Sequence, residues 1–113
     1  MRPLYHPSLN EITVQGILYA LSDPVRARIF AELARAQYPQ NCSAFVFHGK
    51  LKLPKSTLSQ HFKILREAGL IRSERKGVEL KNSTRCSELR KRFGAMVPEI
   101  LLAYASESNE SKR

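Results

Sequence analysis

The stretch KSTLSQHFKILREAGL, residues 55–70, decides how the rest of the chain is interpreted. Its apolar residues Leu58, Phe62 and Leu65 recur at three- and four-residue spacing, which predicts a helix with one core-facing stripe. Gly69 suits the left-handed backbone conformation that commonly follows the end of a helix. We therefore expect a helix that buries one face, exposes the other and ends just before this glycine.

The exposed face of this predicted helix carries short polar side chains near its N-terminus. Ser and Thr form helices less readily than Lys, Glu or Arg, because their hydroxyls compete for backbone hydrogen bonds. Short side chains let a helix N-terminus approach phosphate closely, and Gln can form two hydrogen bonds with adenine. An ordinary solvated face is the alternative. We favour a surface that reads DNA, made of Lys55, Ser56, Thr57, Ser59, Gln60, His61 and Lys63.

The charge balance supports a nucleic-acid partner. The 113-residue chain has 19 Lys and Arg against 10 Asp and Glu, a formal net charge of +9. Residues 50–81 hold nine basic and three acidic residues, so most of the excess charge lies with the predicted helix. Charge concentrated in this way attracts DNA or RNA, or less often an anionic membrane.

No segment indicates membrane insertion or export. The longest apolar run, ILLAYA at residues 100–105, is too short to cross a bilayer. The first residues, MRPLYHPSLN, lack the apolar core of a leader peptide. We therefore expect a cytoplasmic protein that does not bind membranes.

Two helices are predicted ahead of residues 55–70. Apolar residues recur at helical spacing over residues 9–21. Next, Ser22 or Asp23 can cap a second helix, for which Pro24 suits the first position. That helix should end before Pro39, because the residue preceding a proline disfavours helical backbone.

Two shorter elements flank the central helix. CSAFVFHGK, residues 42–50, predicts either a short helix or a buried strand. LIRSERKGVELKN, residues 70–82, alternates polar and apolar residues around Lys76 and Gly77. Because glycine adopts the positive φ that a tight turn needs, this segment predicts a β-hairpin.

The C-terminal part predicts two more helical segments, residues 86–93 and 95–107, interrupted at Gly94 and Pro98. A helix-turn-helix followed by a hairpin is the winged-helix arrangement. We therefore expect a mainly α fold of about five to six helices with a two-stranded wing. The predicted organisation is one domain between two flexible ends: residues 1–8, residues 9–107 and residues 108–113.

Two separate blocks resemble the ArsR/SmtB family of bacterial winged-helix repressors. STLSQHFKILREAGLI, followed by RSERKG, is similar to that family's recognition helix and basic wing. LSDPVRARIFAEL, residues 21–33, is similar to its second helix. The resemblance implies a dimeric repressor that binds a near-palindromic double-stranded DNA operator and is released by an effector.

The resemblance also implies roles for individual residues. The wing that touches flanking DNA would be Arg75, Lys76 and Gly77. The homodimer would be built on the first and last helices, through Leu9, Ile12, Ile17, Val97, Ile100, Leu101 and Tyr104.

The chain departs from the metal-sensing members of this family. Cys42 has no second cysteine two residues on, and the last predicted helix contains no histidine. His6 and His48 stand alone, whereas a metal site needs several converging ligands. We therefore transfer no metal site and expect no cofactor, and the sequence does not identify the small-molecule effector that the resemblance implies.

Three other functions are compatible with parts of the sequence. Cys42 and Cys86 would make the repressor redox-responsive if they formed a pair, although two small buried residues are the simpler interpretation. The basic winged helix could serve RNA or a protein, but the major groove of A-form RNA does not admit a helix. Catalysis by Ser59 and His61 is disfavoured, because side chains two residues apart on a helix point about 200° apart. We expect no enzymatic activity.

Overall fold

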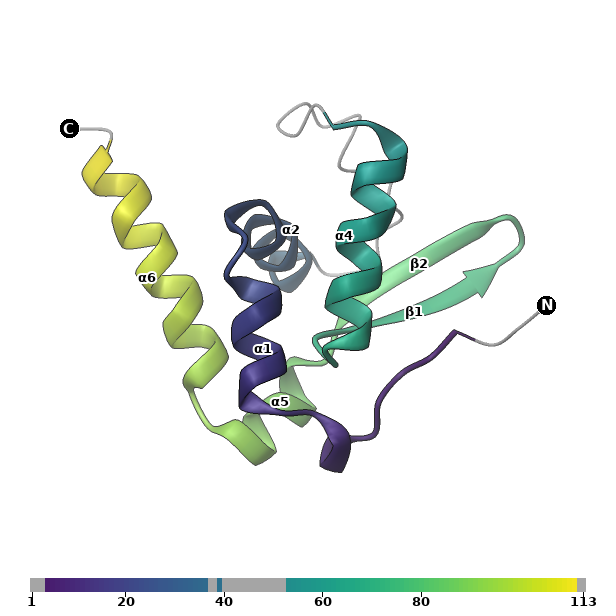
Figure 1. Ribbon diagram of the computed structural model, residues 1–113, viewed down its shortest axis with the longest axis horizontal. Helices are drawn as coiled ribbons and strands as arrows, with labels where there is room; N and C mark the ends of the chain where they lie inside the picture. The colour runs from purple at the N-terminus through teal and green to yellow at the C-terminus, as the bar shows by residue number, and fades with distance from the viewer. Residues whose placement is uncertain (1–3, 37–38, 40–52, 112–113) are drawn as a thin grey trace.

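The computed structural model describes residues 4–36, 39 and 53–111. In this part of the chain, five α-helices and a short 3-10 helix accompany one antiparallel hairpin (Figure 1). The elements are η1 Leu9–Glu11, α1 Val14–Leu21, α2 Pro24–Arg35, α4 Lys55–Glu67, β1 Ile71–Lys76, β2 Glu79–Thr84, α5 Cys86–Phe93 and α6 Met96–Ser111. This order confirms the predicted winged helix-turn-helix fold. The predicted element at residues 42–50, with Cys42 and His48, lies outside the described residues.

The first predicted helix is two elements rather than one. Ile12 and Thr13 have extended backbone between η1 and α1. The hydroxyl of Thr13 accepts a hydrogen bond from the Gly16 amide at 2.9 Å and so starts a new helix. The next helix begins as predicted, because Asp23 accepts from the amides of Val25 and Arg26, and Pro24 occupies the first helical position.

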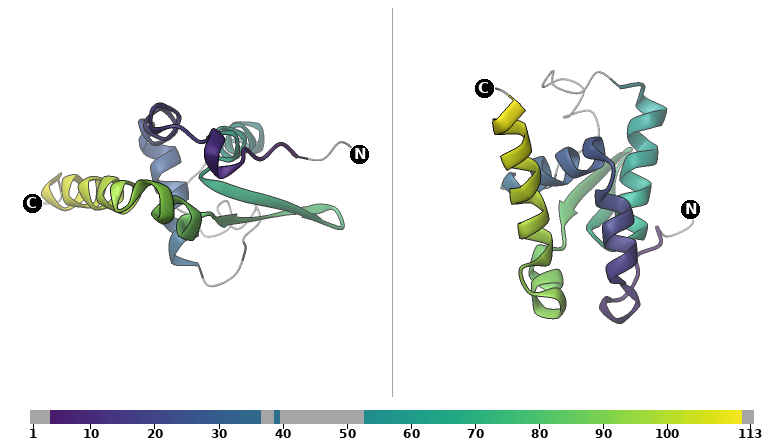
Figure 2. Two further views of the ribbon diagram at one scale, coloured as in Figure 1. Left: turned by 90° about the horizontal axis from the view of Figure 1, so that it is seen from below. Right: turned by 60° about the vertical axis from the view of Figure 1, so that its left-hand side comes forward.

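The core lies where α2 and α4 face each other and the base of the hairpin. Leu58, Phe62 and Leu65 are at most 2% exposed, which confirms the apolar stripe predicted for α4. Phe30 from the middle of α2 and Leu89 of α5 are equally buried. Figure 1 and the left view of Figure 2 show α6 and the hairpin projecting on opposite sides of this centre. The core therefore fixes the direction in which α4 presents its polar face.

The hairpin turns one residue later than predicted. Lys76 is the last paired residue of β1 and lies opposite Glu79, so the turn consists of Gly77 and Val78. Gly77 has a φ of 65°, and Val78 does not have a positive φ. A turn with glycine in positive φ at its first central position matches the right-handed twist of the strands.

The C-terminal helices differ from their predicted form at the proline. Gly94 separates α5 from α6 as expected, with a φ of 61°. Pro98 does not interrupt α6, because it lies in the first turn, where a helix has no acceptor for the backbone amide. The backbone of α6 continues to Ser111, into the predicted tail. Within the described residues, none of the helices has the length and apolar character needed to span a membrane.

Candidate nucleic-acid interface

The polar face of α4 is open to solvent. Lys55, Ser56, Thr57, Ser59, Gln60 and Lys63 are all exposed, as the sequence predicts for this face. His61 is half-buried, and its Nδ1 is buried without a hydrogen-bond partner in the described part of the chain. The same helix buries its apolar stripe against the core, so the exposed side chains have a fixed orientation.

The N-terminus of α4 is not capped by a side chain. The residue that precedes the helix is Pro54, whose ring offers no acceptor, and the described residues provide no other side-chain cap. Ser56 and Thr57, which could have acted as caps, lie inside the first turn instead. Free backbone amides together with the helix dipole favour an anion at such a helix end. An exposed lysine, Lys55, stands at the same end.

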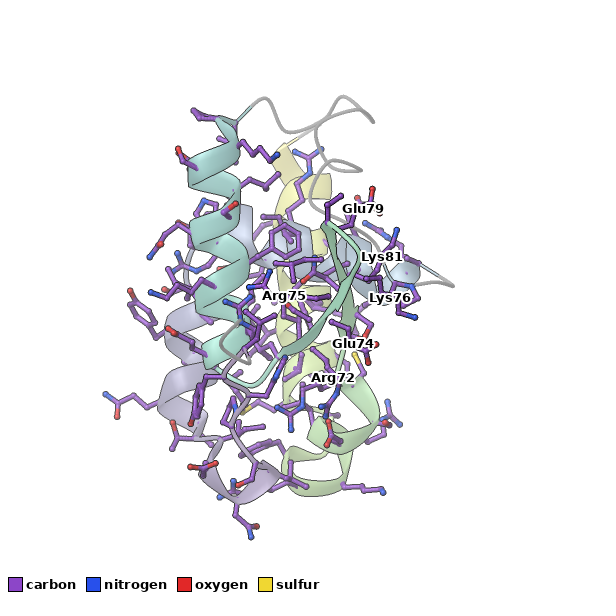
Figure 3. All side chains as sticks on the ribbon, turned by 90° about the vertical axis from the view of Figure 1, so that its right-hand side faces the viewer. Arg72, Glu74, Arg75, Lys76, Glu79 and Lys81 are labelled. Atoms are coloured by element: carbon purple, nitrogen blue, oxygen red, sulfur yellow. The ribbon has the colours of Figure 1, made fainter. Side chains whose placement is uncertain are left out.

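The predicted wing residues lie on two different faces of the hairpin. Figure 3 shows Arg75 on the side nearer α4, whereas Lys76 lies on the opposite side with Arg72, Glu74, Glu79 and Lys81. Strand pairing gives the same division, because directly opposed residues share a face and Arg75 is opposite Leu80. Arg75, Lys76 and Gly77 are all exposed.

The face that carries Lys76 is electrostatically mixed. Glu79 forms an ion pair with Lys81 at 3.0 Å, and Glu74 lies opposite Lys81 on the paired strand. Arg72 also has a carboxylate partner, Glu88 of α5, at 3.3 Å. Arg75 is therefore the wing residue whose charge lies on the side of α4 and away from these carboxylates.

The residues predicted to form a dimer divide into two groups. Ile12, Ile17 and Val97 are at most 3% exposed and belong to the core of the protomer itself. Leu9, Ile100, Leu101 and Tyr104 are partly buried against that core. The hydroxyl of Tyr104 donates a hydrogen bond to the carbonyl of Leu21 and thereby links α6 to the end of α1.

The large apolar side chains that remain open to solvent on these helices are different ones. They are Val14, Leu18 and Tyr19 on α1 and Leu102 on α6, with exposures from 45% to 63%. The sequence pattern found the apolar helices but not which of their residues the protomer covers by itself. A partner surface on α1 and α6 would consist of the exposed set.

One of the two cysteines, Cys86, lies in the described part of the chain. Cys86 is exposed at the first residue of α5, and Cys42 lies outside the described residues, so their pairing stays a prediction. Across residues 4–36, 39 and 53–111 there is no group of three or more His, Cys, Asp or Glu side chains that could hold a metal ion.

One structural residue was missed by the sequence analysis. His6, regarded above as a lone histidine, accepts a hydrogen bond at Nε2 from the backbone amide of Ser73 in β1, at 3.0 Å. The two residues are 67 positions apart, and no local pattern connects them.

Comparison with known proteins agrees with this arrangement. Residues 21–74, which include α2, α4 and most of β1, match a family of helix-turn-helix domains. No curated protein sequence matches the chain. Among solved structures, the chain is similar to an ArsR-like transcriptional regulator from Rhodococcus sp. RHA1. The two are 26% identical over 86% of this chain and 83% of the other, with a TM-score of 0.58.

Regulators of this family and fold are not normally enzymes. The helix-turn-helix match, the winged fold and the similarity to an ArsR-like regulator together support a DNA-binding transcriptional regulator with an ArsR-like winged helix-turn-helix fold.

Proposed function

We propose that the protein is a homodimeric repressor that reads a near-palindromic DNA operator with α4 and contacts the flanking DNA with its wing. The observation that carries this proposal is the contrast between the two faces of α4. One face is locked into the core by Leu58, Phe62 and Leu65, and the other exposes Ser59, Gln60 and their polar neighbours. A rigid helix with short exposed side chains fits the major groove of B-form DNA.

Within α4, the residues divide by the contacts that they can make. Gln60 can donate to and accept from adenine, and Lys63 can reach guanine or phosphate. Ser56 and Thr57 flank the uncapped amides at the helix start, where a phosphate oxygen would complete the missing hydrogen bonds. Ser59, which is exposed, and His61, which is half-buried, complete the proposed DNA-reading set.

Arg75 is the favoured wing contact. It is exposed and on the α4 side of the hairpin, so DNA bound to α4 approaches this face first (Figure 3). Lys76 and Gly77 are close to the tip and would contact the adjacent backbone. Contacts of this kind add affinity without reading sequence.

A dimer would place two copies of α4 in successive major grooves about 34 Å apart. The apolar side chains exposed on α1 and α6 support such a dimer, because a partner would remove Leu18 and Leu102 from water. Each half-site of a near-palindromic operator would then meet one protomer.

The repressor role and its release rest on the family resemblance. An unidentified small molecule would lower DNA affinity only if it binds better to a conformation of the dimer that fits the operator poorly.

The test is an unbiased selection of duplex DNA with the purified protein, followed by affinity measurements on the best duplex. We expect an inverted repeat, and affinity that falls steeply between low and moderate salt because phosphate contacts release counterions. The matched competitor is double-stranded RNA of the same sequence, which should bind far more weakly because its major groove is narrow. Equal binding to every duplex, or affinity that does not change with salt, would contradict the proposal.

A further inference from the structure

The segment ahead of η1 is attached at two points, to β1 of the wing and to the residue that follows β2. We call residues 4–8 the arm. The Ser73 amide of β1 donates to His6 Nε2 at 3.0 Å, and Arg85 Nη1 donates to the carbonyl of Pro7 at 2.8 Å. Pro7 is buried, and Arg85, which follows β2, is only 4% exposed. Figure 1 shows the arm leaving η1 and running toward the hairpin. The arm is therefore docked at β1 and at the residue that follows β2.

The first of these contacts requires a neutral imidazole. Nε2 can accept the Ser73 amide only through its lone pair, and a proton at Nε2 would place two donors against each other. His6 also forms a hydrogen bond with the backbone of Leu4. An imidazole that accepts at Nε2 and donates from its other nitrogen satisfies both contacts.

The surroundings of His6 oppose its protonation. Burial lowers the pKa of His6, and the charges of Arg72 on β1, Arg66 on α4 and Arg85 lower it further. The hydrogen bond with Leu4 acts in the opposite direction. Glu88 of α5, the carboxylate bound to two of these arginines, is engaged by Arg85 and Arg72. The imidazole thus faces three guanidinium groups and no free carboxylate within this cluster.

The residue that His6 holds lies at the junction of the wing and α4. Ser73 is 3% exposed, and its hydroxyl donates to Oδ1 of the buried Asn82 on β2 at 2.6 Å. Arg66 of α4 donates to the same hydroxyl at 3.4 Å. The arm, both strands of the wing and the end of α4 therefore meet at Ser73.

We propose that His6 is a positioning residue for the wing. In its neutral form it ties the arm to β1 and holds the hairpin in its orientation relative to α4. Protonation at Nε2 removes the acceptor of the Ser73 amide, releases the arm and lowers DNA affinity. This last step rests on the proposed DNA-binding function, whereas the docking of the arm does not.

The experiment uses the full chain and three variants. His6→Ala removes the acceptor, and His6→Gln replaces it with an amide oxygen that does not titrate. Tyr5→Ala is the matched control, since Tyr5 is the exposed neighbour of His6 in the arm. Two properties are measured between pH 5 and 8 at constant ionic strength. They are the exchange protection factor of the Ser73 amide by NMR, without DNA, and the affinity for the selected duplex.

For the unmodified protein we expect Ser73 protection and DNA affinity to fall together as the pH is lowered through the pKa of His6. His6→Ala should have the low values at every pH, with affinity reduced on the order of fivefold, as expected for one hydrogen bond. His6→Gln should keep Ser73 protected at pH 5 and bind DNA more tightly there than the unmodified protein. His61 is present in every variant, so the differences between variants do not arise from it.

The two parts of the inference fail in distinguishable ways. Full Ser73 protection in His6→Ala would overturn the docking contact itself. Lost protection with unchanged DNA affinity would overturn the positioning role. If the unmodified protein selects no duplex, the proposed function fails and the effect on affinity fails with it, while the exchange data still decide whether His6 holds the arm.

Discussion

Gly69 packs against Ile12 so closely that no side chain fits between them. A Cβ placed on Gly69 would lie 2.4 Å from Cγ1 of Ile12 and 2.5 Å from Cδ1. Gly69 also has a φ of 88°, which side chains rarely tolerate. The chain can therefore leave α4 in this direction only with a glycine, and the side chain of Ile12 closes the core at this point.

Gly69→Ala should destabilise the fold by about 2–4 kcal/mol, because it adds both backbone strain and a steric clash in the core. Gly94→Ala is the matched control: its φ is 61°, but a Cβ there meets nothing within 4 Å, so only the backbone strain remains. Denaturant unfolding measures both variants. In Ile12→Ala/Gly69→Ala the clash is relieved, so the loss should be smaller than the sum of the single losses. Additive losses would show that the contact with Ile12 is not the cause.

Gln60→Ala should cost about 1–3 kcal/mol of binding to the selected operator and relax preference at one base pair, because a bidentate contact is lost. Arg75→Ala and Lys76→Ala should weaken binding to all duplexes alike and reduce the salt dependence, with the larger effect at Arg75, which lies on the α4 side. Gln15→Ala on α1 is the control, since Gln15 is an exposed glutamine distant in sequence from the wing. Affinity is measured on the operator and on single-base variants. A uniform loss for Gln60→Ala would contradict its assigned role.

The sequence predicted the helices whose formation depends on residues close together in the chain. The stripe of Leu58, Phe62 and Leu65 follows from helical spacing, and the start of α2 follows from Asp23 and Pro24. The turn at Gly77 was displaced by one residue, because alternation alone does not say whether Lys76 belongs to the turn or to the strand.

Contacts between distant residues were not predictable in this way. Ser73 and Asn82 are polar residues of the hairpin, and the sequence alone suggests that they face solvent. Each is nevertheless at most 3% exposed, and the hydrogen bond between their side chains makes this burial tolerable. The arm contact joins residues 67 positions apart. Similarly, an apolar stripe predicts that the side chain of Ile17 is buried. It does not predict whether the residues that bury it belong to the same chain or to a partner.

Leu102→Glu should shift the protein toward a monomer, because a charge on the exposed apolar surface of α6 opposes its burial by a second copy. Sedimentation velocity at several concentrations measures the shift. Binding to an operator with two half-sites should weaken more than binding to a single half-site, since only the former gains from a dimer. Ser87→Glu, at an exposed polar position of α5 outside the proposed partner surface, is the control for the added charge. An unmodified protein that sediments as a monomer at every concentration would refute the dimer.

Glu88→Gln should lower stability at neutral pH and have little effect at low pH. The Glu88 carboxylate accepts from Arg85 Nε at 2.6 Å and from Arg72 at 3.3 Å. The hydrogen bond from Arg85 holds the pKa of Glu88 below its usual 4.5, and the charges of Arg85 and Arg72 lower it further. The ionised form of Glu88 is therefore favoured in the folded state. Its contribution to the free energy of unfolding is complete above about pH 4.5 and is lost as the pH falls through the folded-state pKa.

The expected loss for Glu88→Gln at pH 7 is about 1–2 kcal/mol. This is less than for a fully buried pair, because the Glu88 side chain is 35% exposed and solvent screens its charge, although that of Arg85 is only 3% exposed. Glu79→Gln removes the surface pair with Lys81 and should cost less than about 1 kcal/mol at any pH. Urea unfolding at pH 7 and at a series of lower pH values measures both losses, and the loss for Glu88→Gln should shrink progressively as the pH falls below about 4.5. A loss that stays the same down to the lowest pH at which the protein folds would mean that Glu88 contributes through packing rather than through its charge, because protonation of the carboxylate removes only the latter.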